Sequence, residues 1–188
     1  MHISRSIWTL ILLLGLTAVP AVAGPPLICH SIDIGSRHSL PWLVTERWNG
    51  ADPTYNVVRL IDDVLDILVP DAPVRVRMET LRRAAIYSAR ETGLSDRLTV
   101  RLVARAMDAT AAGTPDPSAW FDAGYFVETL RDAAKIYPKL QGPERDAWMI
   151  RTAPQIDGLA WIRTAVRMGD AGVRPVVAIV EEARTKVH

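Results

Sequence analysis

The residues that could do chemistry gather in one short stretch, Pro25 to Pro41. It holds the only cysteine, Cys29, and the only histidines away from the chain ends, His30 and His38. Together with the carboxylate of Asp33, they form a mixed ligand set that suits zinc or copper. The stretch therefore predicts a metal site formed by Cys29, His30 and His38, although their spacing matches no standard zinc motif. The alternative is a buried Cys29 that packs as a small apolar side chain.

The same residues suggest two further chemistries. Cys29 and His30 match the second half of the haem-attachment motif C-x-x-C-H, but Pro26 stands where the first cysteine belongs, so haem would be held by one thioether. A catalytic thiol needs an imidazole within hydrogen-bond reach. Adjacent side chains of an extended chain point to opposite sides, so only His38, after a turn at Gly35, could serve.

Motifs of the known nucleotide-binding loops, zinc proteases and serine hydrolases do not occur in the sequence. We therefore predict no catalytic residue and no cofactor, with zinc, copper or haem as alternatives at Cys29, His30 and His38. A hydrolase or transferase of another type would have to use residues that no motif marks.

Residues 1–23 have the pattern of a secretory signal peptide. Arg5 gives a positive start, residues 7–19 are mainly apolar, and the small residues Ala21 and Ala23 precede Gly24. The apolar run is shorter than the about 20 residues needed to span a bilayer. We expect cleavage before Gly24, export to the periplasm or the extracellular space, and no stable membrane anchor afterwards. An uncleaved anchor is the alternative.

Charge excludes one class of partner. The leader contains one arginine and no acidic residue, so the remaining chain has 21 basic and 21 acidic side chains. Proteins that bind nucleic acid normally carry a basic patch or an overall positive charge. We therefore expect no nucleic-acid partner, and a protein or a small ligand as the partner instead.

The chain after the leader divides into an extended arm, residues 24–51, and one α-helical domain, residues 52–188. The arm is rich in proline and glycine, and no helical period is sustained in it. In the domain, apolar residues recur with helical spacing and no β-hairpin signal occurs. These patterns predict an all-α fold of stacked antiparallel helix hairpins. The helices are expected at about 52–70, 73–93, 95–113, 118–137, 143–151 and 159–168, with a last one that begins at Pro175.

Two segments of the domain resemble each other. Both read E-T-L-R and are followed by A-A and I-Y; they begin at Glu79 and Glu128, 49 residues apart. Stacked helix hairpins of the tetratricopeptide and HEAT types repeat every 34 to about 47 residues. The similarity indicates either a true repeat or chance convergence of amphipathic helices. We expect the pairs of Glu79 with Arg82 and of Glu128 with Arg131 to lie on exposed helix faces.

Residues 120–125, W-F-D-A-G-Y, resemble the W-x-x-L-G opening of a tetratricopeptide helix. The resemblance covers six residues, has Ala123 in place of leucine, and places the tyrosine at another offset. It implies a helical array whose hairpins leave a groove, and we predict that Asp122, Tyr125, Glu128 and Glu79 line it. An exported, non-enzymatic helical scaffold that binds a ligand in such a groove is therefore our leading hypothesis, and a metal- or haem-binding protein is the alternative.

Overall fold

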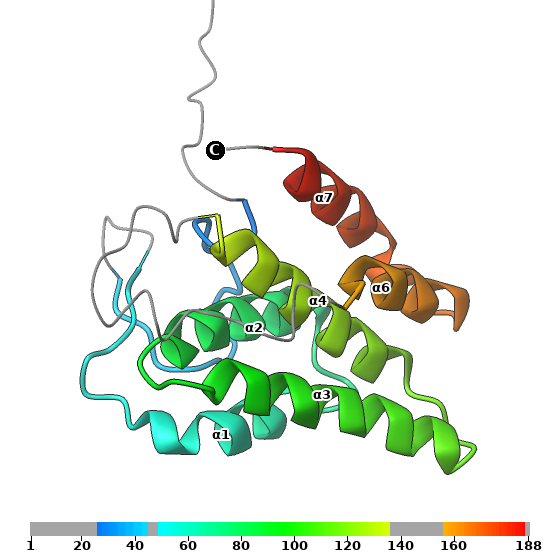
Figure 1. Cartoon of the computed structure of the whole chain (residues 1–188), viewed down its shortest axis with the longest axis horizontal. Coiled ribbons are helices and arrows are strands. Elements are labelled where there is room, and N and C mark those ends of the chain that lie inside the picture. The colour runs from blue at the N-terminus through cyan, green and yellow to red at the C-terminus, as the bar shows by residue number, and fades with distance from the viewer. Residues whose placement is uncertain (1–25, 45–48, 136–155, 187–188) are drawn as a thin grey trace, which may run out of the picture.

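The computed structural model describes residues 26–44, 49–135 and 156–186, and within them the chain is mostly helical (Figure 1). The only β-type pairing in this part of the chain is an isolated antiparallel bridge between Trp42 and Ala51. The all-α class is thus confirmed, whereas the stacking of antiparallel hairpins stays a prediction. The signal peptide and the helix expected at 143–151 lie outside the described residues. No helix among the described residues is long and apolar enough to cross a membrane.

The elements follow the predicted helical segments closely. They are the 3₁₀ helix η1 (Val57–Arg59), α1 (Leu60–Ile67), α2 (Val74–Ser88), α3 (Leu94–Ala111), α4 (Pro117–Ala133), α6 (Gly158–Arg167), the 3₁₀ helix η4 (Ala171–Val173) and α7 (Arg174–Thr185).

The first helix begins later than the sequence predicts. It was expected to begin at about residue 52, but the side chain of Asp52 accepts a hydrogen bond from Thr54 N at 2.8 Å and closes a separate turn. Asn56 caps η1, which leads directly into α1, by accepting from Val58 N at 3.1 Å. This shift matters because it leaves residues 52–56 outside the helix, where they form one side of a cleft.

Helix α4 lies at the centre of the fold. It contacts α2 and α3 on one side and α6 and α7 on the other, which fits its apolar and aromatic composition (Figure 1). Asp116 caps it by accepting from Ser118 N at 2.9 Å, and Pro117 occupies its first turn, where a missing N–H costs nothing. Residues 121–130 are all buried.

Two glycines let α4 and α6 approach each other backbone to backbone. A Cβ atom added to Gly124 of α4 would lie 2.5 Å from Gly158 O, and one added to Gly158 would lie 2.5 Å from Gly124 O. Neither position has room for a methyl group. The start of α6 is therefore fixed against the middle of α4 by the absence of side chains.

The arm belongs to the same core as the helices. Leu27, Ile28 and Leu40 are buried in it, at 3%, 0% and 1% exposure, whereas residues 33 and 35–38 between these anchors are exposed. Buried apolar side chains thus anchor the arm to the helices at two places, and most residues between these anchors are exposed.

Candidate functional site

The three predicted metal ligands lie in different surroundings. Cys29 is half-buried and packs against the core, and His30 Nδ1 lies 3.3 Å from the carbonyl oxygen of Pro26. His38 is exposed on the far part of the arm. Within the described ranges no group of three or more His, Cys, Asp or Glu side chains is arranged to hold a metal ion. Binding of zinc, copper or haem by these residues stays a prediction without a preformed ligand set.

The four residues predicted to line a groove are buried. Glu79 and Asp122 are 0% exposed, and Tyr125 and Glu128 are 1% exposed. Each of the three carboxylates is buried and pairs with arginine. The expectation of an exposed ion pair is wrong for Glu79 with Arg82, whereas in the pair of Glu128 with Arg131 only the glutamate is buried. In the conformation described, these side chains serve the protein's own packing, and their use by a ligand stays a prediction.

Asp122 shows what this burial does to a carboxyl group. Arg77 Nη1 donates to Asp122 Oδ2 at 2.6 Å, and Arg105 Nη1 lies 3.7 Å from the same oxygen. Burial raises the pKa of Asp122 to about 7, although the charges of Arg77 and Arg105 act in the opposite direction. Burial also raises the pKa of the neighbouring Tyr125, which therefore stays neutral.

The first E-T-L-R segment holds the backbone of the arm. Glu79 Oε2 accepts from Ile32 N at 2.9 Å, and Arg82 Nη1 donates to Ile28 O at 3.1 Å. The two side chains also bond to each other, at 2.8 and 2.9 Å, and both are 0% exposed. We call such a pair, which takes one N–H and one carbonyl from the same segment, an E-x-x-R clamp.

The second segment forms the same clamp on another piece of chain. Glu128 Oε1 accepts from Leu159 N at 3.2 Å, and Arg131 Nη2 donates to Ile156 O at 2.6 Å. Arg184 of α7 adds bonds of 2.7 and 2.8 Å to Glu128. The sequence similarity at a spacing of 49 residues is therefore matched by a shared structural role.

Further side chains of α2 and α4 fix both ends of the arm. Asp132 Oδ2 accepts from Leu27 N at 2.7 Å, and Arg83 Nη1 donates to Leu40 O at 2.6 Å. The hydroxyl of Tyr87 donates to Pro41 O and accepts from Asp52 N at 2.9 Å. One buried hydroxyl thus ties the end of the arm to the start of the helical domain.

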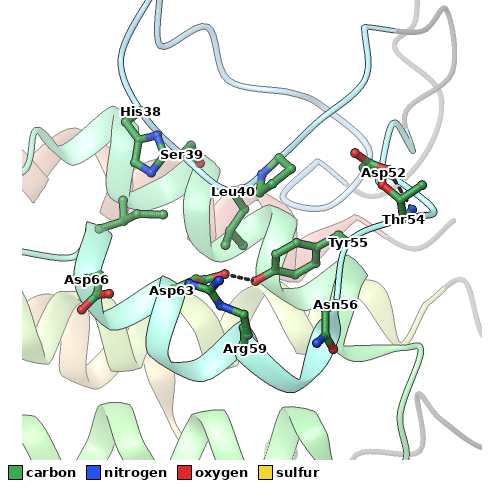
Figure 2. A pocket seen from close by; sticks show the side chains of 12 residues that line it. His38, Ser39, Leu40, Asp52, Thr54, Tyr55, Asn56, Arg59, Asp63 and Asp66 are labelled. Carbon is green, nitrogen blue, oxygen red and sulfur yellow. Dashed lines mark hydrogen bonds and ion pairs between the residues drawn. The ribbon is translucent and has the colours of Figure 1, made fainter.

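Because the arm is held in this way, an open cleft forms between it and α1 (Figure 2). The cavity has a volume of about 600 Å³, within the range of ligand pockets. Residues far apart in sequence meet there. The lining consists of His38, Ser39, Leu40 and Pro41 of the arm, Asp52, Thr54, Tyr55 and Asn56 of the following turn, and Arg59, Asp63, Asp66 and Ile67 of η1 and α1.

One wall of the cleft is an ordered polar network. Tyr55 OH donates to Asp63 Oδ2 at 2.7 Å, and Arg59 Nη2 donates to Asp63 Oδ1 at 3.1 Å (Figure 2). Burial and the Asp63 carboxylate raise the pKa of Tyr55, whereas hydrogen bonds from Thr54 lower the pKa of Asp52. At neutral pH the tyrosine is thus neutral and Asp52 is charged, so neither is tuned to exchange a proton near pH 7.

The charges of the cleft do not balance. Asp52, Asp63 and Asp66 line it together with one arginine, Arg59. Asp66 is exposed, and no hydrogen bond or ion pair joins it to another described side chain. His38 and Asp66 lie on opposite walls, one on the arm and one on α1 (Figure 2). The cleft consequently offers an available carboxylate on a surface of negative charge.

A second cavity of about 600 Å³ lies between α1 and α3 and makes a useful contrast. Its charged lining side chains are Arg101, Arg105, Asp108 and Asp116, two of each sign, and Arg105 lies 3.3 Å from Asp116. This cavity is as large as the cleft, but its lining charges cancel, so it favours neither cations nor anions.

Sequence reasoning missed the cleft. Asp63 and Asp66 lie off the apolar stripe of the first helix, which indicates exposure but not what they face. The position of His38 opposite them depends on contacts of the arm with α2. Such contacts join residues about 40 positions apart, as between Ser39 Oγ and Thr80 Oγ1 at 2.9 Å.

The fold and the cleft define an all-α protein in which a non-helical arm closes one side of a pocket. Comparison of the chain with models of protein families, with curated proteins and with solved structures found no match.

Proposed function

We propose that this chain is an exported, non-enzymatic binding protein whose ligand, a small organic cation, occupies the cleft between the arm and α1. One observation carries the proposal. The cleft combines ligand size, about 600 Å³, with three carboxylates against a single arginine. A concave surface lined by one sign of charge concentrates ions of the opposite sign. Export rests on the signal-peptide pattern of residues 1–23.

Each wall has a distinct part in this proposal. Asp66 supplies the carboxylate that pairs with the cationic group, because no other described side chain engages it. Tyr55 presents a half-buried ring held in place by its bond to Asp63, and rings attract cations through their faces. Leu40 and Pro41 of the arm provide apolar surface for the rest of the ligand.

The pKa shifts of Tyr55 and Asp52 do not suit these two side chains to proton transfer at neutral pH. A general acid or base works best when its pKa lies near the working pH. The pKa of Tyr55 is raised and that of Asp52 is lowered, so both are moved away from neutrality. The cleft is thus suited to holding a charged ligand.

The test is isothermal titration calorimetry of the chain from Gly24 onwards with choline, spermidine and arginine amide, and with citrate as an anionic control. We expect binding of at least one cation and none of citrate. Asp66→Asn should weaken that binding about tenfold, a loss typical of one charged hydrogen bond. The matched control is Asp62→Asn, an exposed carboxylate on the same helix that does not line the cleft. Equal loss in both variants, or no cation binding at all, would contradict the proposal.

A further inference from the structure

The surface of α2 and α4 under the arm has the features of a site for extended peptides. It holds the arm mainly through backbone atoms, which every peptide possesses. The bonded atoms are Leu27 N with Asp132, Ile28 O with Arg82, Ile32 N with Glu79, Asp33 O with Arg75, Leu40 O with Arg83 and Pro41 O with Tyr87. Contacts of this kind give affinity without reading side-chain identity.

Side-chain selectivity is concentrated at the first anchor. Leu27 and Ile28 are buried at 3% and 0% exposure, whereas Ser31 and Asp33 are exposed. The surface therefore takes two consecutive aliphatic side chains and then the backbone that follows them. This pattern defines the chemistry of a partner: an extended segment with an aliphatic pair and a free N–H four residues after its second member.

The second clamp shows that the Glu and Arg pair is not specific for the arm. Glu128 and Arg131 bind the N–H of Leu159 and the carbonyl of Ile156, in a segment that leads into a helix. Two pairs of the same residue types thus hold two different sequences in two different backbone conformations. Because both pairs bond to backbone atoms, this arrangement does not depend on the side chains of the segment that it holds.

The arm can leave without breaking the helices. Between residues 26 and 41 its only described backbone-to-backbone hydrogen bond is local, from Arg37 N to Ile34 O at 3.3 Å. Its other bonds are local, as from Gly35 N to Asp33 Oδ1, or end on side chains of α2 and α4, whose own backbone hydrogen bonds do not involve the arm. Segments of this kind open at a lower free energy than the whole fold.

We propose that the surface formed by Glu79, Arg82 and Asp132 is a peptide-binding site that the chain's own residues 27–32 occupy. An extended peptide with an aliphatic pair binds there in exchange for the arm. The arm is then an internal competitor. The apparent affinity for the partner equals the intrinsic affinity multiplied by the fraction of time that the arm is detached. This inference does not rest on the cation cleft, because Glu79, Arg82 and Asp132 do not line that cleft.

Fluorescence anisotropy tests it with a labelled peptide of the arm sequence, residues 25–41, kept under reductant. The double substitution Leu27→Ser and Ile28→Ser weakens the internal competitor within the full chain from Gly24. We expect this variant to bind the peptide about tenfold or more tightly than the unaltered chain. Ser36→Ala, in the exposed part of the arm, is the matched control and should bind as weakly as the unaltered chain. Absence of binding to a double variant with an unchanged circular dichroism spectrum would overturn the proposal.

Two additional measurements separate binding from unfolding. A peptide with a methyl group on the nitrogen of Ile32 cannot donate to Glu79 and should bind about tenfold more weakly, whereas the same change at Ser36 should have no effect. In the unaltered chain, an excess of unlabelled peptide should speed hydrogen exchange at the amides of Leu27 and Ile32 but not in α4. Exchange that is equal in arm and α4, with or without peptide, would overturn the proposal even if the double variant does not fold.

Discussion

The two E-x-x-R clamps use the same residue types to hold backbones of different conformation. The clamp on α2 holds a non-helical arm, and both of its side chains are fully buried. The clamp on α4 holds the first turn of α6, and its Arg131 and Arg184 side chains are 33% and 30% exposed. From this comparison we expect that burial of the arginine, more than the bond pattern, decides how much stability is lost when each glutamate is replaced.

The largest effect is expected from Glu79→Gln. The change removes the carboxylate that pairs with the buried guanidinium of Arg82, and breaking a buried ion pair costs about 3–5 kcal/mol. Urea unfolding followed by circular dichroism measures the loss. Asp62→Asn, which removes an exposed carboxylate, should change stability by at most about 0.5 kcal/mol. A loss in Glu79→Gln no larger than in this control would show that Arg82 reaches water.

Gly124→Ala tests how firmly α6 is seated beside the second clamp. Its methyl group would meet Gly158 O at 2.5 Å, and backbone atoms cannot turn aside as side chains can. Overpacking of this kind costs about 2–3 kcal/mol, measured as a shift of the urea midpoint. Gly35→Ala adds a methyl group in open space at a φ of 60° and should cost only about 1 kcal/mol. Equal losses in the two variants would mean that α6 is free to shift.

Glu128→Gln should cost less than Glu79→Gln, about 2 kcal/mol, because its arginine partners can turn toward water. Hydrogen exchange should report the change in α6 and α7 and leave the arm unaffected. A loss equal to that of Glu79→Gln would remove the distinction between the clamps.

Tyr87→Phe removes one hydroxyl that bonds to Pro41 O and to Asp52 N, and should cost about 1 kcal/mol. Limited proteolysis should then cut the chain near Pro41 faster, while the amides of Leu27 and Ile32 keep their protection. Faster exchange at those amides as well would show that the two anchors of the arm are coupled.

The smallest expected effects concern how the free energy of unfolding changes with pH. Burial tends to raise the pKa of Glu79, but bonds from Arg82, Ile32 and Arg83 outweigh it and lower the pKa. The contribution of Glu79 to stability is therefore lost as pH falls below its unfolded value of about 4.5.

Asp122 should behave in the opposite way. Its folded pKa of about 7 lies above its ordinary 3.8, so its contribution is full below pH 3.8 and declines as pH rises to about 7. Unfolding free energies measured between pH 4 and 7 should fall less steeply in Asp122→Asn than in the unaltered chain. An identical slope, or a carboxyl titration near pH 3 by NMR, would contradict the raised pKa.

Much of the fold follows from the sequence, since apolar spacing and breakers such as Pro70 and Gly113 place the helices locally. The helix expected from Ser118 begins at Pro117, and the one expected from Leu159 begins at Gly158. The start expected at Asp52 is wrong because Asp52 closes its own turn and Asn56 caps the 3₁₀ helix η1 that precedes α1.

The candidate sites could not be predicted in the same way. Periodicity assigns Glu79 and Arg82 to a polar face, but it cannot tell that the arm covers this face. The E-T-L-R similarity was a valid signal for the clamps, yet its meaning depends on contacts with Ile32 and Leu159, which lie 47 and 31 residues away. Burial of charge is a property of the assembled molecule, and no local pattern records it.

The continuous burial of residues 121–130 in α4 has a consequence for how this protein tolerates change. A helix at a protein surface accepts substitutions on its outer face, so tolerated and forbidden positions alternate about every 3.6 residues. In α4 that alternation should vanish, leaving ten adjacent positions where almost every replacement is selected against. Saturation mutagenesis would show it as an unbroken block, and this block is the part of the sequence by which distant relatives should be recognised.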